Sequence, residues 1–233
     1  MIRGHRFHSE WWGAPVGVID DPAFLSLPAE ERARQLSEYS WVELRAGMKS
    51  IDPLALHEAG FTQIDTQVAF RINIAQVPSG PSLAAFDVER ASDSPFMIAG
   101  DEIAPFTHER FRHIRGITAE RIDARFALWA RQHLAMHPEW CLRITSGGIT
   151  QGWFLSAMTK EGLNLELAML HRQATISGMY LYQKALTTYA AFGARVGFAR
   201  FSVENTAVMN IYARLGAQFL APLGIWLWTG EER

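Results

Sequence analysis

An apolar strand that runs through a short loop into a helix places the tightest constraint on the fold of this chain. Residues 163–170 alternate as a strand does, and residues 171–178 form a loop that opens a helix over 177–192. Such a junction presents unpaired backbone N–H groups and the positive end of a helix, which together suit a phosphate or pyrophosphate. Any strand-to-helix turn offers some of this, so for the loop alone a structural role is the commoner explanation.

The remaining pattern predicts an α/β (α+β type) chain with a mixed sheet whose faces are covered by helices. The clearest strand is residues 64–74, in which apolar and polar residues alternate strictly. Other expected strands are 141–145, 150–158, 196–203 and a last one around 226–228. Expected helices begin near residue 28 and span 52–60, 118–136 and 206–215. No internal repeat is visible.

Charge and composition divide the chain. Residues 1–106 carry 8 Lys/Arg against 15 Asp/Glu, whereas residues 107–233 carry 14 against 9. Residues 78–105 lie at the change, with a Pro-Ser-Gly-Pro segment and then an acidic run, a composition typical of a linker or long loop. We therefore expect two units of about a hundred residues each.

The same numbers exclude several classes of protein. A net charge of -2 argues against general nucleic-acid binding, which needs a basic excess. The single cysteine, Cys141, fits a reducing compartment, and neither a signal peptide nor a membrane-spanning segment is visible, which predicts a cytoplasmic protein with no membrane partner. The eight histidines show no metal-ligand spacing, so no metal is expected. The apolar last strand hints at a homodimer interface, but a hydrophobic core explains it equally well.

Two motifs stand in a recognisable order. The loop matches the first and last positions of Arg/Gln-x-x-Gly-x-Gly/Ala with Gln173 and Gly178, while Ile176 occupies the middle glycine position. Asn205, Tyr212 and Gly216 then match Asn-x-x-Ala-x-x-x-Tyr-x-x-x-Gly-Phe. In this order the chain resembles the GNAT acetyltransferase superfamily. A β-branched residue is strained at positive φ, so the loop path at Ile176 must differ from the family's.

Segments of the amino-terminal half resemble one particular group within this superfamily. Residues 9–13 (Ser-Glu-Trp-Trp-Gly), 59–61 and 106–111 look like segments of dTDP-fucosamine acetyltransferase-like proteins. The resemblance implies a partial GNAT-like domain with linker over residues 1–105 and a GNAT acetyltransferase domain over 106–233. It also implies transfer of an acetyl group from acetyl-CoA to a small-molecule amine, first of all that of a nucleotide-linked amino sugar.

Acyl transfer to an amine needs a neutral amine, a polarised carbonyl and a protonated leaving thiolate. The resemblance makes Tyr212 the acid toward the sulfur, although it also belongs to an apolar helix face and suits a core position equally. Glu166, a charge inside an apolar strand, is the candidate base, with pairing to an arginine or exposure to solvent as alternatives. His171 is a second candidate base, more simply explained as a surface residue.

The cofactor-binding residues follow from the same resemblance. Backbone N–H groups of Met169 and Leu170 would polarise the thioester if the strand separates from its neighbour. Asn205 would bind the pantetheine arm or cap the following helix, and capping is the commoner role. The pyrophosphate would lie on the loop, which consists of Arg172, Gln173, Ala174, Thr175, Ile176, Ser177 and Gly178.

Two other functions stay open. One is acetylation of a protein, a peptide or a small polyamine-like amine. The other is a non-catalytic module that kept the fold and lost the cofactor site through Ile176.

Overall fold

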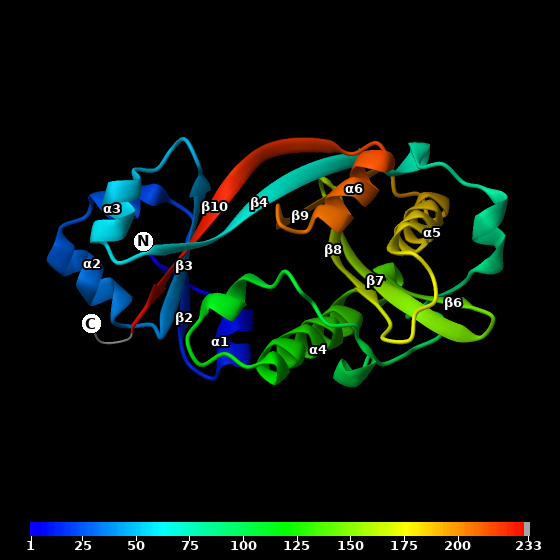
Figure 1. Cartoon of the computed structure of the whole chain (residues 1–233), viewed down its shortest axis with the longest axis horizontal. Helices are drawn as coiled ribbons and strands as arrows, with labels where there is room; N and C mark the ends of the chain where they lie inside the picture. Colours follow the sequence, from blue (N-terminus) through cyan, green and yellow to red (C-terminus); the bar gives the residue numbers. More distant parts are fainter. Residues whose placement is uncertain (231–233) are drawn as a thin grey trace.

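The computed structural model describes residues 1–230, which build a ten-stranded sheet with helices on both faces (Figure 1). The strands lie in the order β1-β2-β3-β10-β4-β9-β8-β7-β6-β5, and only the β2–β3 and β8–β9 pairs are parallel. The expected mixed, mostly antiparallel sheet is therefore confirmed. The strands are β1 Arg3–Gly4, β2 Val16–Ile19, β3 Trp41–Gly47, β4 Thr62–Asn73, β5 Asp87–Arg90, β6 Cys141–Ser146, β7 Ile149–Thr159, β8 Gly162–Leu170, β9 Val196–Ser202 and β10 Gln218–Thr229.

The helices begin and end at residues with clear local causes. Asp52 and Thr118 cap α3 and α4 through their side chains, and Gly193 and Gly216 follow α5 and α6 at positive φ. The α-helices are α1 Arg6–Trp12, α2 Ala29–Leu36, α3 Pro53–Glu58, α4 Ala119–Met136, α5 Gly178–Ala191 and α6 Thr206–Arg214. The 3₁₀ turns are η1 Pro22–Ser26, η2 Ile74–Gln76, η3 Pro81–Ala85, η4 Gly100–Glu102, η5 Arg110–His113 and η6 Pro138–Trp140.

One sheet runs through both halves of the chain. Strand β10, the last element, lies between β3 and β4 of the amino-terminal half, and β4 pairs with β9 from Gln67 to Asn73. The segment 78–105 is not a plain linker, because it contains β5, which pairs with β6, and two 3₁₀ turns. The division into domains at residues 105 and 106 stays a prediction.

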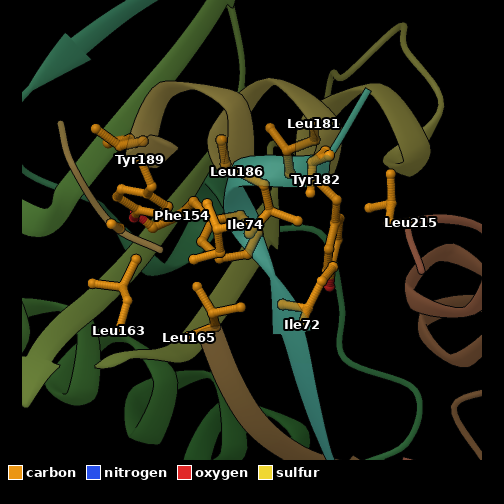
Figure 2. Packing of buried hydrophobic residues seen from close by; sticks show 14 of the residues in the cluster. Ile72, Ile74, Phe154, Leu163, Leu165, Leu181, Tyr182, Leu186, Tyr189 and Leu215 are labelled. Carbon is orange, nitrogen blue, oxygen red and sulfur yellow. The ribbon is translucent and has the colours of Figure 1, made fainter. Parts of the chain in front are cut away.

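Each face of the sheet has its own core. Helix α5 packs against β4, β7 and β8 through a cluster that includes Ile72, Phe154, Leu165 and Leu186 (Figure 2). Helix α4 covers the opposite face, where Phe126 packs with residues of β6, β7 and β8. Within residues 1–230, no helix is both long and apolar enough to span a bilayer.

Candidate active site between strands β8 and β9

Strands β8 and β9 start as neighbours and then separate. Their parallel pairing consists of Leu163 with Gly197 and Asn164 with Phe198, after which the ladder ends although both strands continue. Beyond Asn164, β8 is therefore not paired with β9, and its backbone edge on that side is open until the Leu170 carbonyl, which accepts from the Ala104 amide. The predicted polarisation of the thioester carbonyl by the backbone N–H groups of Met169 and Leu170 requires this separation.

A β-bulge in β8 decides which way its side chains point. Between the Leu155–Leu167 and Ala157–Asn164 pairs, Leu165 and Glu166 together lie opposite the single residue Ser156. The extra residue switches the faces, so that Leu165 packs in the α5 cluster whereas Leu167 packs in the α4 cluster. Residues 163–166 alternate regularly, so Glu166 lies with Asn164 on the face of the sheet that α4 covers, and the bulge adds Leu167 to that face.

A groove of about 560 Å³ begins at the start of α5 and passes the open edge of β8. Its walls include Gly178 of α5, Arg214 of α6 and Leu170 of β8, and it reaches Phe126 on the other face. We call this cavity the α5–α6 groove. Arg214 has no carboxylate partner among residues 1–230, so its charge is free to meet an anion. The addition of a Cβ at Gly178 would place it 3.5 Å from Cδ1 of Ile211 across the groove.

The loop before α5 offers fewer free amides than the sequence predicts. The N–H groups of residues 172–175 donate within the protein, to the Glu102 carbonyl, to His171 Nδ1, to the His171 carbonyl and to the Gln151 side chain. Among the described residues, no acceptor faces the N–H groups of Ile176, Ser177 and Gly178. The backbone N–H groups of Gln173, Ala174 and Thr175, which the sequence led us to expect on the phosphate, therefore donate within the protein instead. The N–H groups that remain free lie at the start of α5.

Ile176 and Asn205 each occupy a relaxed local structure. No non-glycine residue of 1–230 has positive φ, so the loop path at Ile176 differs from a glycine turn as expected, and its side chain packs on the α5 cluster. Asn205 caps α6 by accepting a hydrogen bond of 3.2 Å from the Val208 amide, and it also lines the α5–α6 groove. The side chain of Arg172 reaches 3.5 Å from the Ile103 carbonyl and does not line the groove.

At the end of β8, Leu170 and Met169 face opposite ways. The carbonyl of Leu170 accepts a hydrogen bond of 2.9 Å from Ala104, a residue outside β7. In a strand, the N–H and C=O of one residue share an edge, so the Leu170 N–H also points toward the gap. His171 donates its N–H to the Gln151 carbonyl of β7, so by alternation the backbone groups of Met169 also point toward β7 and away from the gap. Of the two predicted donors, only Leu170 is placed to meet a ligand there.

A second cavity, of about 490 Å³, lies where α1 and α4 cover the gap. We call it the arginine cavity, because Arg45, Arg110, Arg125 and Arg200 all line it. Glu166 is on its wall, with Oε2 3.6 Å from His133 Nδ1 and Oε1 accepting a hydrogen bond of 2.8 Å from Asn164. Burial lowers the pKa of His133, and the Glu166 carboxylate opposes that shift. Glu166 therefore faces a largely neutral imidazole at pH 7.

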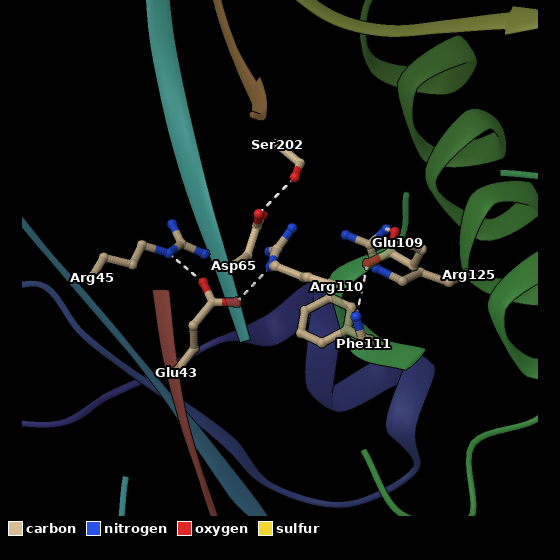
Figure 3. A network of polar contacts seen from close by, with 8 residues as sticks. All are labelled: Glu43, Arg45, Asp65, Glu109, Arg110, Phe111, Arg125 and Ser202. Carbon is tan, nitrogen blue, oxygen red and sulfur yellow. Dashed lines mark hydrogen bonds and ion pairs between the residues drawn. The ribbon is translucent and has the colours of Figure 1, made fainter. Parts of the chain in front are cut away.

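Buried carboxylates hold three of the four arginines (Figure 3). Glu43, fully buried on β3, pairs with both Arg45 and Arg110. Burial raises the pKa of Glu43, but the two guanidinium groups outweigh it and hold the pKa at about 2. Glu109 pairs with Arg125 over 3.1 Å, and burial lowers the pKa of Arg125 to about 10 against the effect of that carboxylate.

Tyr212 lies in the α5 cluster. Its ring centroid is 3.9 Å from that of Phe70, the residue is 3% exposed, and it lines neither of the two cavities. Burial raises the pKa of its hydroxyl well above the ordinary value. This position matches the core alternative considered for Tyr212, and its role as an acid stays a prediction. His171 lies at the loop, where its Nδ1 accepts from the Gln173 amide.

Sequence reasoning missed most of the arginine cavity. Glu43 and Arg45 carry the signal that identified Glu166, a charge inside an apolar run, since they interrupt Trp41–Gly47. His133 was visible as a histidine within the apolar stripe of α4. Arg110 and Arg200 carry no local signal, because only the fold brings η5 and β9 to the same cavity.

No protein-family model matches the sequence, and no curated protein matches it either. Solved structures do resemble the fold. A GCN5-related N-acetyltransferase from Sphaerobacter thermophilus is similar with a TM-score of 0.52 at 16% identity, over 81% of this chain and 59% of its own. One from Kribbella flavida has a TM-score of 0.52 at 15% identity, over 93% and 82%.

A tandem GNAT protein from the clavulanic acid biosynthesis pathway is similar over 95% of this chain and 77% of its own, with a TM-score of 0.54 at 12% identity. At such identities the likeness concerns the fold alone. The chain adopts the GNAT fold, as the motifs implied, and nothing in these neighbours bears on an amino-sugar acceptor.

Proposed function

We propose that the protein transfers an acyl group, first of all acetyl, from coenzyme A to a primary amine. The observation that carries the proposal is the position of the two cavities. The α5–α6 groove and the arginine cavity lie on consecutive parts of β8, Leu170 and Ala168 lining the first and Glu166 the second. Likewise, Glu109 lines the α5–α6 groove and Arg110, the next residue in the sequence, lines the arginine cavity. A donor and an acceptor entering separately would meet at the open edge of β8.

The α5–α6 groove has the features that the donor requires. Free N–H groups at residues 176–178, at the positive end of the 14-residue helix α5, suit a pyrophosphate, and Arg214 adds a cation. The pantetheine arm would pass along the open edge of β8. We therefore assign donor binding to residues 176–178, in place of the whole loop of residues 172–178 that the sequence led us to expect.

On the protein side, two groups serve the reaction. The Leu170 N–H would donate to the thioester oxygen, where negative charge develops as the amine attacks. Glu166 accepts the proton that the attacking amine must lose, directly or through water. The leaving group is a thiolate whose ordinary pKa, like that of a cysteine near 8.5, is low enough to need little assistance.

Titration calorimetry with acetyl-CoA tests the proposal first. We expect a saturable heat at one site per chain, which competing coenzyme A removes. Release of free thiol with an amine panel, containing an amino sugar, its nucleotide-linked form, a polyamine and a peptide, then identifies the acceptor. Absence of saturable heat would mean a non-catalytic module with the GNAT fold and would reject the proposal.

A further inference from the structure

The charges around the arginine cavity do not balance. Four arginines line it, while the carboxylates that contact them are Glu43 and Glu109, and Glu166 is occupied by His133 and Asn164. Four histidines also line it, and three of them, His5, His8 and His133, do not add charge at pH 7, because burial lowers the pKa of each. The cavity therefore keeps an excess of positive charge.

Arg200 accounts for this excess. It lies on β9 at the gap, and within the described part of the chain its guanidinium has no hydrogen-bond or carboxylate partner. Partial burial lowers the pKa of Arg200 and the nearby charge of Arg45 lowers it further, whereas the charges of Asp20 and Glu43 raise it. Arg200 is exposed at the wall of the cavity, and it is the lining arginine that no carboxylate contacts within residues 1–230, so an anion bound there would meet an uncompensated cation.

A second, independent sign comes from the deepest arginine. Arg125 is 4% exposed and lines the same cavity, yet its Nε–H has no acceptor within residues 1–230. Nδ1 of His8, also almost fully buried and lining the cavity, lacks a partner as well. Buried polar atoms without partners are uncommon, and here they share one cavity with an unpaired arginine.

From this geometry we infer that the acceptor amine carries an anionic group, a carboxylate or a phosphate, which binds Arg200 and Arg45 while the amino group lies at Glu166. Arginine suits both anions, because its planar fork gives two parallel hydrogen bonds. The inference rests on the proposed acyl transfer and adds the acceptor's chemical class. A polyamine-like acceptor, which is cationic at pH 7, or a peptide without an acidic side chain is disfavoured.

Matched acceptors test the charge requirement. Glucosamine is compared with glucosamine 6-phosphate, and tyramine with tyrosine, at fixed acetyl-CoA. We expect kcat/KM of the preferred anionic member to exceed that of its neutral partner by roughly 10- to 100-fold, the worth of one charge-assisted hydrogen bond. The pair showing the larger ratio distinguishes phosphate from carboxylate. Equal rates within both pairs, or preference for a peptide, would overturn the inference and leave the transferase intact.

Substitutions of Arg200 test whether this residue causes the preference for an anionic acceptor. Arg200→Gln should bring the anionic-to-neutral ratio close to one through KM, with the dissociation constant of acetyl-CoA unchanged, and Arg200→Lys should restore part of it. Arg195→Gln, at an exposed arginine just before β9, is the matched control and should change neither quantity. A ratio that survives in Arg200→Gln would contradict the assignment.

A binding measurement keeps the inference testable without turnover. Inorganic phosphate and acetate are titrated in thermal unfolding, at constant ionic strength. At least one should raise the Tm saturably in the natural protein and much less in Arg200→Gln, whereas Arg214→Gln in the α5–α6 groove should retain the shift. An anion effect that is absent, or that Arg214→Gln abolishes instead, would reject the site even if acetyl-CoA binds.

Discussion

Oε2 of Glu166 lies 3.6 Å from Nδ1 of His133, although the two residues come from a strand and from the helix across it. Glu166 lies on the same face of β8 as Asn164, two residues before it, and that face is the one that α4 covers. Asn164 holds the other oxygen at 2.8 Å. The carboxylate is thereby fixed at the gap between β8 and β9.

Replacing Glu166 by Gln tests this carboxylate as the base. We expect kcat to fall by roughly 100-fold or more, the usual contribution of a positioned base. The acetyl-CoA dissociation constant should stay the same, because Glu166 does not line the α5–α6 groove. Steady-state rates and calorimetry measure the two quantities. Glu161→Gln, at the exposed turn before the same strand, serves as control, and a Glu166→Gln rate equal to that control would exclude the role.

Gly178→Leu should close the α5–α6 groove. The new side chain begins 3.5 Å from Ile211 Cδ1 and extends into the space between α5 and α6. Because Gly178 has no positive φ, the backbone tolerates the change, and the Tm should shift by only a few degrees. We expect the acetyl-CoA heat to disappear. Ala191→Leu, at the exposed other end of α5, should bind normally; binding retained in Gly178→Leu would place the donor elsewhere.

Tyr212→Phe tests whether Tyr212 acts as a general acid or only packs in the core. Phenylalanine preserves the packing against Phe70 and Tyr182, so the Tm should hardly change. Since Tyr212 lines neither cavity, we expect kcat within about threefold of the natural protein, well below the loss of a general acid. A fall of two orders of magnitude with unchanged acetyl-CoA binding would instead establish the hydroxyl as the proton donor.

Glu43 should make stability depend on acid pH. Its pKa is about 2 when folded and 4.5 ordinarily, so its ion pairs stabilise fully above pH 4.5 and progressively less as the pH falls toward 2. Glu43→Gln should flatten this dependence and, by leaving Arg45 and Arg110 unpaired, cost about 3–5 kcal/mol at pH 7. Urea unfolding across pH measures both. Glu58→Gln, at an exposed position of α3, is the control, and an unchanged pH slope in Glu43→Gln would contradict the assignment.

Local sequence patterns determined the elements that contain their own signals. The alternation of residues 64–74 predicted β4, and Asp52, Thr118, Gly193 and Gly216 marked helix ends that the structure has. These signals are local because capping hydrogen bonds and left-handed turns involve residues a few positions apart. Strand β3 was not predicted, because residues 41–44 are buried on both faces and include Glu43, so that apolar and polar residues do not alternate.

The site depended on contacts that no local pattern encodes. The chain itself supplied the loop, Glu166 and the order of motifs, and hence the fold. Only the tertiary structure decided that the 172–175 amides are used internally, that Met169 faces β7, and that Arg45, Arg110, Arg125 and Arg200 share a cavity. Charges from four separate elements meet there because sheet order and helix packing, set by the whole core, determine which distant residues become neighbours.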